Sequence, residues 1–317
     1  HNRKHSFPTR RSSDLDHPWT KTNPEYYIRG DQGEFVPPVP DWSDVIDLNF
    51  ENREMRGEMI DSMRYWVTEF GIDGFRCDVA GEVPLDFWQE ARAALNEART
   101  VVMLAEDGGF HLHDRAFEMS YAWPHMGMMR QVVRGEKTVD DLYHLDLETQ
   151  EQLGDKAFRM RFITNHDENS WNGTLQEDYG EAERVFFVYT VIAPGMPLVY
   201  TAQEAGLDKR LEFFEKDPVE WGDHPNRAFI TTLLQLKRRS PALWNGAAGG
   251  SFERISTTRD DAIYAILREN EGSRILALLN LTDEAVDFRL TNESGLADYT
   301  EVFGHDVPNF DQTISID

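Results

Sequence analysis

The chain has 317 residues, of which 40% are hydrophobic and 28% charged. This length and composition can bury a large core, which excludes collagen-like, low-complexity and disordered classes. The net charge is −25, and so acidic a surface repels phosphate backbones, so we expect no nucleic-acid partner. No apolar run reaches the roughly 18 residues of a membrane-spanning helix. The single cysteine, Cys77, excludes an internal disulfide framework.

Residues 1–15 differ from the rest of the chain. They carry four arginines and lysines and one acid, Asp14, without an apolar run of the kind that marks a signal peptide. The segment 7–15 resembles a translated sequencing adapter, so we expect residues 1–15 to be non-native. The alternative is a basic, disordered interaction arm. In either case no targeting signal can be read, and the bacterial cytoplasm, the periplasm and secretion all stay open.

The remaining chain begins with an irregular segment and continues with alternating elements. Residues 16–49 are rich in proline and aromatic residues, which predicts little regular structure. Apolar periodicity then predicts helices and short strands in alternation. The expected helices are 52–70, 85–99, 182–192 and 228–239, and the expected strands are 75–79, 101–105, 117–121, 158–163 and 197–200.

Strands that alternate with helices at this spacing indicate parallel βα units. The pattern changes after residue 245, where strand-length runs at 262–267, 274–281 and 285–290 follow one another without a helix. Such runs indicate a small antiparallel β domain. We therefore expect an α/β protein with a parallel sheet and a C-terminal β domain.

Three of the expected strands end in an acid, namely Asp78, Glu106 and Asp167. In a parallel α/β barrel, active sites gather at the carboxyl ends of the strands, so these acids are candidates for one pocket. The alternative for each acid alone is that it caps the helix after its strand. Three such acids, each after an apolar strand, favour a site.

Three converging carboxylates suit two kinds of chemistry. A retaining glycosidase uses one carboxylate as nucleophile and one carboxylic acid as proton donor. A divalent metal site also takes Asp, Glu and His ligands, and His166 next to Asp167 fits either use. Arg76 lies two residues before Asp78, so both side chains share one strand face, where the guanidinium favours an ionised Asp78. That positive charge opposes a metal cation, so we favour sugar chemistry. Among the aromatic residues near these segments, Trp42, Trp123, Trp171 and Tyr200 can stack on sugars or pack in the core.

At this point the sequence resembles the α-amylase family of retaining α-glucan hydrolases and transglycosylases. The order and spacing of five segments carry the resemblance, which extends from Asp16 to Asp317. These segments are 47–49 (DLN), 74–80 (GFRCDVA), 105–106 (AE), 162–167 (FITNHD) and 195–204 (GMPLVYTAQE).

The resemblance implies a role for each matching residue. Asp78 would be the catalytic nucleophile and Glu106 the general acid/base. Asp167 would stabilise the transition state through the sugar hydroxyls, Arg76 would orient Asp78, and His166 would bind the same sugar. The catalytic set is thus Asp78, Glu106 and Asp167, and the substrate-binding pair is Arg76 and His166.

The resemblance also implies a fold, and the sequence departs from the family pattern in one motif. The family fold is a (β/α)₈ barrel with an inserted B domain and a C-terminal β-sandwich. The family's first motif, which ends in Asn-His, is absent, so we expect a partial barrel whose first three units are missing. The expected parts are a B-domain remnant at 16–50, later barrel units at 51–244 and a C-terminal β domain at 245–317.

The expected substrate is an α-glucan. Residues 79–82 (VAGE) resemble neopullulanase- and cyclomaltodextrinase-like members, which favours malto-oligosaccharides cleaved mainly at α-1,4 bonds. A transglycosylase, a catalytically dead carbohydrate-binding fragment and metal-dependent barrel chemistry are the alternatives. No cofactor is required and no catalytic metal is expected, although Asp47 matches a family position for a structural Ca²⁺.

Overall fold

The computed structural model describes residues 13–42, 44–291 and 299–317. The chain divides into two compact units between Tyr121 and Ala122, and each unit is described by itself. The expected non-native segment 1–15 falls mostly outside the described residues. Of its last residues, Ser13 accepts a hydrogen bond from the backbone of Ile46 and Asp14 forms an antiparallel bridge with Val45.

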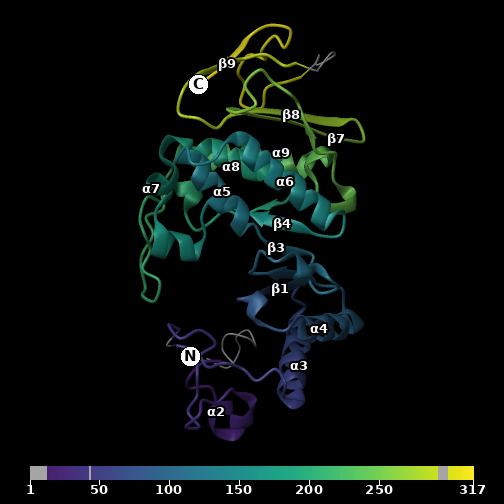
Figure 1. The fold of residues 1–317 in the computed structure, drawn as a ribbon, viewed down its shortest axis with the longest axis vertical. Coiled ribbons are helices and arrows are strands. Elements are labelled where there is room, and N and C mark those ends of the chain that lie inside the picture. Colours follow the sequence, from purple (N-terminus) through teal and green to yellow (C-terminus); the bar gives the residue numbers. More distant parts are fainter. Residues whose placement is uncertain (1–12, 43, 292–298) are drawn as a thin grey trace. The chain divides into compact units, whose positions relative to one another are not determined.

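The first unit carries three parallel strands, β1 (Gly74–Cys77), β2 (Val102–Ala105) and β3 (Met119–Tyr121), in that order (Figure 1). The register pairs Cys77 with Ala105, so β1 and β2 end together and the residues after them emerge at one edge of the sheet. The helical segments of this unit are α2 (Trp19–Thr22), η1 (Pro24–Tyr26), α3 (Arg53–Phe70), η2 (Ala80–Glu82), α4 (Leu85–Ala98) and η3 (Phe110–His113).

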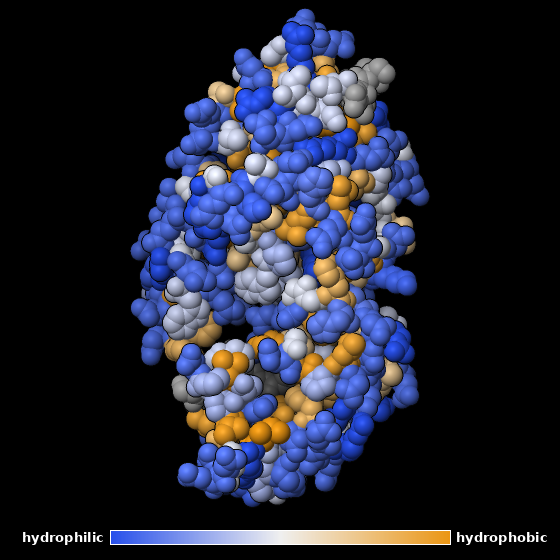
Figure 2. All heavy atoms as spheres, in the orientation of Figure 1, coloured by the Kyte–Doolittle hydropathy of each residue, from blue (hydrophilic) through white to orange (hydrophobic). Residues whose placement is uncertain are grey.

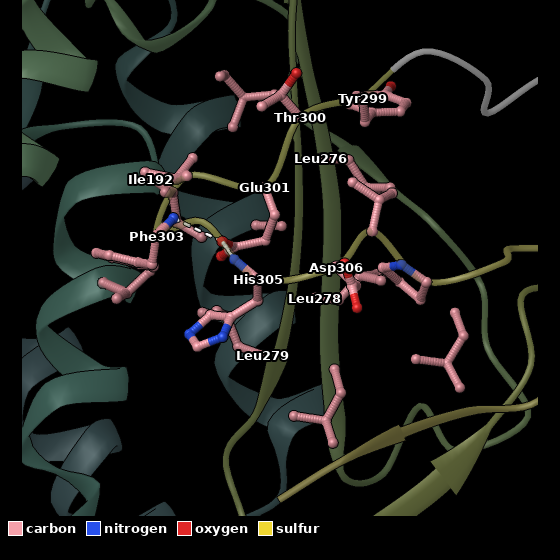
Figure 3. Close-up of a pocket in the computed structure, with 18 of the residues that line it drawn as sticks. Ile192, Leu276, Leu278, Leu279, Tyr299, Thr300, Glu301, Phe303, His305 and Asp306 are labelled. Atoms are coloured by element: carbon pink, nitrogen blue, oxygen red, sulfur yellow. Dashed lines mark hydrogen bonds between the residues drawn. The ribbon is translucent and has the colours of Figure 1, made fainter.

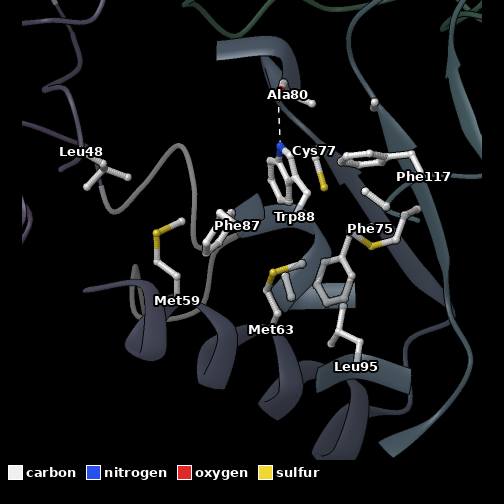
Figure 4. Packing of buried hydrophobic residues seen from close by; sticks show 14 of the residues in the cluster. Leu48, Met59, Met63, Phe75, Cys77, Ala80, Phe87, Trp88, Leu95 and Phe117 are labelled. Carbon is white, nitrogen blue, oxygen red and sulfur yellow. Dashed lines mark hydrogen bonds between the residues drawn. The ribbon is translucent and has the colours of Figure 1, made fainter. Parts of the chain in front are cut away.

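Helix α3 shows why the sequence folds as it does in this unit. The side chain of Asn52 accepts hydrogen bonds from the backbone of Glu54 and Met55, which caps the start of the helix. Gly71 ends it with φ 65°, a left-handed conformation that glycine adopts without strain. The buried methionines of α3 pack with Phe75 and Trp88 in one hydrophobic cluster (Figure 4). The expected helix 52–70 is thus confirmed almost residue for residue.

The second unit begins with parallel strands β4 (Phe158–Arg161) and β5 (Met196–Pro197), which pair through Met160 and Met196. Strand β5 is shorter than the expected strand 197–200. In Figure 1, α8 and α9 lie between β4 and the C-terminal strands. The helical segments are α5 (Trp123–Val133), α6 (Val139–Leu153), η4 (Glu168–Asn172), α7 (Leu175–Tyr179), η5 (Gly180–Ala182), α8 (Glu183–Ile192), η6 (Gln203–Ala205), α9 (Pro225–Arg239), η7 (Pro241–Leu243) and η8 (Gly246–Ala248).

Antiparallel sheets form the C-terminal part of this unit, as expected. Strands β6 (Glu253–Arg254), β7 (Ile263–Asn270) and β8 (Ser273–Asn280) make one sheet, and β9 (Val286–Phe288) pairs with β10 (Ile314–Ile316). The turn between β7 and β8 is Glu271-Gly272, and both residues have positive φ, as a tight hairpin turn requires.

A buried ionic cluster joins α6, β4, α8 and β7. The fully buried carboxylate of Asp146 accepts hydrogen bonds from Arg161 at 2.6 Å and from the hydroxyls of Tyr189 at 3.0 Å and Tyr264 at 2.6 Å. Burial raises the pKa of Asp146, but Arg161 and the hydrogen bonds outweigh it and lower that pKa to about 2. Asp146 is therefore ionised at neutral pH and ties β7 to the helical layer.

The structure bears on the predicted fold at two levels. It confirms an α/β chain with parallel strands followed by antiparallel sheets. The partial barrel, the B-domain remnant and the boundaries at 50 and 244 stay predictions. Within the described ranges, no helix is long and apolar enough to cross a membrane.

Candidate active site

Arg76 contacts two of the three predicted catalytic acids. Its Nη1 atom is hydrogen-bonded to Oδ1 of Asp78, and its Nη2 atom lies 2.6 Å from Oε1 of Glu106. Arg76 lies in β1, Asp78 follows β1 directly and Glu106 follows β2 directly, so the parallel register brings all three to one edge. The Asp78 side chain is 25% exposed and that of Glu106 12%. Both carboxylates are therefore partly sheltered and still reachable.

Tyr121, at the end of β3, completes the surroundings of Arg76. The Nε atom of Arg76 donates to the Tyr121 hydroxyl at 3.1 Å, and the guanidinium lies 5.5 Å from the ring centroid. Burial works against the charge of Arg76, but Glu106, Tyr121 and Asp78 outweigh it and raise the pKa of the guanidinium. Arg76 is thus a fixed cation between two carboxylates.

The backbone after Asp78 is strained and contributes to the site. Val79 has φ 46°, in the left-handed region that a β-branched residue rarely adopts. Such a conformation costs on the order of 1–3 kcal/mol and gathers at functional sites. In the same turn, the Val79 N–H donates to Oε2 of Glu106 at 2.9 Å. The strained turn therefore helps to hold the acid next to Arg76.

Buried side chains pack next to this turn. The indole of Trp88 is fully buried and donates to the carbonyl of Ala80 at 3.0 Å (Figure 4). Cys77 is also buried, and burial raises the pKa of its thiol to about 12. Cys77 is thus a small core residue.

The other two predicted residues, His166 and Asp167, lie together in the second unit. Nε2 of His166 is 3.4 Å from Oδ2 of Asp167, and both side chains are partly exposed. The side chain of Asn165 accepts hydrogen bonds from the backbone of Asp167 at 3.0 Å and Glu168 at 2.9 Å, which fixes the turn into η4. Burial and the charge of Asp167 raise the pKa of Tyr200.

The four aromatic residues singled out in the sequence have different surroundings. Trp123 packs edge-on against Phe162, 5.0 Å between centroids, in the manner of a core residue. Trp42 is partly buried, and the half-buried Tyr200 faces the charge of Asp167. Trp171 is 58% exposed. Of the four, Trp171 alone presents most of its side chain to solvent.

Sequence reasoning missed Tyr121, Val79 and Asn165. Tyr121 is the last residue of its strand, and Asp78 and Glu106 directly follow theirs. Its position at a strand end could therefore have marked it as a site residue. The positive φ of Val79 gave none, because the sequence pattern predicts a strand there.

The described residues offer little for a metal. No group of three or more His, Cys, Asp or Glu side chains within those residues is arranged to hold an ion. Burial raises the pKa of Asp47 and Glu82 contributes to that rise, but these two carboxylates fall short of such a group.

A cavity of 670 Å³ lies in the second unit between α8, α9 and the C-terminal strands (Figure 3). It is lined by apolar side chains such as Ile192, Leu276 and Phe303 and by the polar side chains of Glu301 and His305. It contains none of the predicted site residues.

The fold and the strand-end acids define the class of protein to which the chain belongs. The model of the alpha-amylase catalytic domain matches residues 17–289. This chain belongs to the alpha-amylase family, as its motifs indicated.

Relatives in this family include enzymes with related names. The chain is 26% identical over 254 residues to alpha-amylase MalA of Haloarcula japonica, which covers 77% of this chain and 36% of that protein. It is 26% identical over 255 residues to the maltogenic alpha-amylase of Bacillus acidopullulyticus, a match that covers 76% of this chain and 42% of that protein. It is 25% identical over 250 residues to a cyclomaltodextrinase from a Bacillus species, a match that covers 74% of this chain and 43% of that protein. The chain thus spans less than half the length of these curated relatives.

Solved structures share the fold. A noncanonic maltogenic alpha-amylase, AmyB from Thermotoga neapolitana, matches with a TM-score of 0.77 and 26% identity over 87% of this chain and 64% of that chain. An alpha-amylase from Lactobacillus plantarum matches with a TM-score of 0.74 and 25% identity over 89% and 68%.

Proposed function

We propose that the chain carries the site of a retaining glycoside hydrolase that cleaves α-glucosidic bonds, mainly α-1,4, in malto-oligosaccharides or starch-like α-glucans. The observation that carries the proposal is the contact of one guanidinium, that of Arg76, with the carboxylates of both Asp78 and Glu106. The family membership and the names of the relatives support the choice of α-glucan.

The geometry around Arg76 is compatible with one acid acting as nucleophile and the other as proton donor. Retaining glycosidases hold their two carboxyl groups roughly 5–5.5 Å apart, and contact with a single guanidinium is compatible with that separation. The resemblance assigns the role of nucleophile to Asp78, and the ion pair with Arg76 holds its carboxylate in place. Glu106 is the more sheltered of the two acids, and the resemblance assigns the role of proton donor to it.

The proposed reaction has two steps. Asp78 attacks the anomeric carbon while Glu106 protonates the leaving oxygen, and a covalent glycosyl-enzyme results. Glu106, now ionised, takes a proton from the incoming water, which displaces Asp78 and regenerates the acid. Two displacements restore the original anomeric configuration. The resemblance assigns the binding of sugar hydroxyls to His166 and Asp167.

The proposal extends to the fold. We infer that residues 51–244 are the later units of a (β/α)₈ barrel, because this parallel arrangement brings strand-end acids to one edge.

The test is the stereochemistry of the first product. The chain, and its Asp78→Asn variant, are incubated with maltodextrin and the product is followed by proton NMR. The proposal predicts that the α-anomer forms first and that Asp78→Asn forms almost none. A β-anomer formed first, or unchanged activity in Asp78→Asn, would contradict it. Linkage preference follows from the same assay on pullulan and cyclodextrins, and transfer products longer than the substrate would point to the transglycosylase instead.

A further inference from the structure

Three aromatic side chains of the second unit contact one another on the surface. The rings of Trp171 and Phe213 lie 5.1 Å apart, those of Phe213 and Phe214 4.9 Å, and those of Trp171 and Phe214 6.2 Å. We call Trp171, Phe213 and Phe214 the aromatic platform. The members come from η4 and from the segment after η6, so two separate parts of the chain build it.

The platform leaves large apolar surfaces in water. Trp171 is 58% and Phe214 70% exposed, and Phe213 is half-buried. Single exposed apolar residues are ordinary, whereas contiguous exposed apolar groups are common at ligand-binding surfaces. Hydrophilic residues cover most of the visible face of this unit in Figure 2.

A fixed loop carries the two phenylalanines. The Asn169 side chain donates to the carbonyl of Lys209 at 3.0 Å and accepts from the N–H of Leu211 at 2.9 Å. Lys209 pairs with Asp217 across the loop, and Arg210 pairs with Glu177 at 2.8 Å. Because Asn169 is buried and lies two residues before Trp171, it ties both halves of the platform together.

The platform is continuous with the predicted sugar-binding pair. The ring of Phe213 stacks on that of His166, with 6.2 Å between centroids and 18° between planes. Trp171 lies in η4, four residues after Asp167, which is the N-cap residue of that turn. A ligand held by His166 and Asp167 therefore meets the platform next.

The chemistry of the surroundings narrows the ligand to a neutral one. The loop 207–218 holds four acids and three bases, and Lys209 and Arg210 are already paired with carboxylates. An anionic ligand or an anionic membrane thus finds no available cluster of cations there. A glucose unit has apolar C–H faces that stack on aromatic rings and hydroxyl edges that stay in water, so a neutral glucan fits an exposed platform.

We propose that the aromatic platform of Trp171, Phe213 and Phe214 binds consecutive glucose units of a linear α-glucan, and that Asn169 positions it. The inference rests on the proposed function, because the glucan is taken from it. It adds a surface that selects longer substrates.

The test is binding of maltoheptaose by calorimetry in the full chain with Asp78→Asn, which prevents turnover. Phe214→Ala and Trp171→Ala should each weaken binding about 10-fold, the scale expected for losing one aromatic contact. Phe214→Tyr keeps the ring and should bind within about 2-fold of the parent. Asn169→Ala should weaken binding although every ring is present. Asn169→Asp still accepts a hydrogen bond from Leu211, so its affinity should lie between that of the parent and that of Asn169→Ala.

The matched control is Phe70→Ala. Phe70 is 57% exposed at the end of α3 and precedes β1, so it lies at the opposite end of that strand from Asp78. This variant should bind as the parent does. Ring variants that bind as tightly as the parent, in a chain whose wild type hydrolyses maltodextrin, would overturn the platform alone. Absence of both hydrolysis and binding in the wild type would overturn the proposed function and the platform with it.

Discussion

The Nη2 atom of Arg76 lies 2.6 Å from Oε1 of Glu106, while the Nη1 atom of Arg76 is hydrogen-bonded to Asp78. Arg76 therefore contacts the acid that follows the neighbouring strand as well as Asp78, two residues further along its own chain segment. One guanidinium thereby connects the two acids of the proposed mechanism.

The first prediction concerns this contact. Arg76→Lys keeps the charge but loses the planar fork that reaches two carboxylates at once. We expect kcat on maltodextrin to fall about 100-fold. Tyr121→Phe removes one hydrogen bond to Nε and should lower kcat less than about 10-fold. Steady-state kinetics measure both effects, with urea midpoints to confirm folding, and a kcat for Arg76→Lys close to that of wild type would contradict the assignment.

The second prediction separates the roles of the two acids. Glu106→Gln should lower kcat on maltodextrin about 10²–10⁴-fold, since the leaving oxygen is no longer protonated. Fluoride leaves without a proton, so the first step on α-maltosyl fluoride should be much less impaired in this variant. Asp78→Asn should be inactive on both substrates. Equal losses of Glu106→Gln on both substrates, measured as the burst of fluoride release, would argue against an acid role for Glu106.

The third prediction concerns backbone strain at Ala202. This residue has φ 57°, in the region where an L-residue other than glycine pays about 1–2 kcal/mol. Relief of this strain offsets both the greater flexibility of glycine in the unfolded chain and the loss of the buried Ala202 methyl group. Ala202→Gly should therefore leave the free energy of unfolding within about 0.5 kcal/mol of the wild-type value.

Ala205 is the matched control for Ala202. It ends the same turn, η6, without a positive φ, so Ala205→Gly should destabilise by about 0.5–1 kcal/mol. Urea unfolding of both variants gives the comparison, and a fall in stability for Ala202→Gly as large as that for Ala205→Gly would refute the assignment of strain.

The fourth prediction concerns Lys237, which is buried and donates to the carbonyls of Val191 at 3.0 Å and Leu243 at 2.9 Å. Burial, with the charges of Arg268 and Arg161, lowers the pKa of Lys237 to about 7. The unfolded chain keeps this lysine protonated to about pH 10.4. Between these values the unfolded state binds more protons, so stability rises with pH.

The Lys237→Met variant isolates this effect. The difference in unfolding free energy, wild type minus Lys237→Met, should increase between pH 7 and 9 by up to about 1.4 kcal/mol per pH unit. Other groups, such as Cys77, titrate equally in both proteins and cancel. A difference that does not change with pH would show that Lys237 is charged in the native state.

The position of Asp78 and Glu106 at one edge of the sheet could be predicted from the sequence, because the register of parallel strands follows from chain order. Asp78 and Glu106 come directly after short apolar strands, and parallel pairing brings the ends of such strands to one edge. Helix α3 was equally readable from its cap at Asn52 and its stop at Gly71.

Other parts were not readable from pattern. Helix α5 carries Pro124 in its first turn and Gly127 inside, which weaken a helical prediction, although proline is tolerated there. Helix α6 was missed although Thr138 and Asp141 form a capping box. The aromatic platform depends on Asn169 bonding to a loop some 40 residues further along the chain, a contact that no local periodicity reports.

The central claim, a covalent intermediate on Asp78, is tested most directly by trapping it. Glu106→Gln slows hydrolysis of the intermediate, and 5-fluoro-α-glucosyl fluoride supplies a leaving group that needs no proton. After tryptic digestion, mass spectrometry reports on peptide 77–92, which begins after Arg76 and ends at Arg92. The account predicts one fluoroglucosyl group on Asp78 in this peptide, and none in the Asp78→Asn chain. An unlabelled chain that still turns the substrate over, or a label on another peptide, would contradict the account.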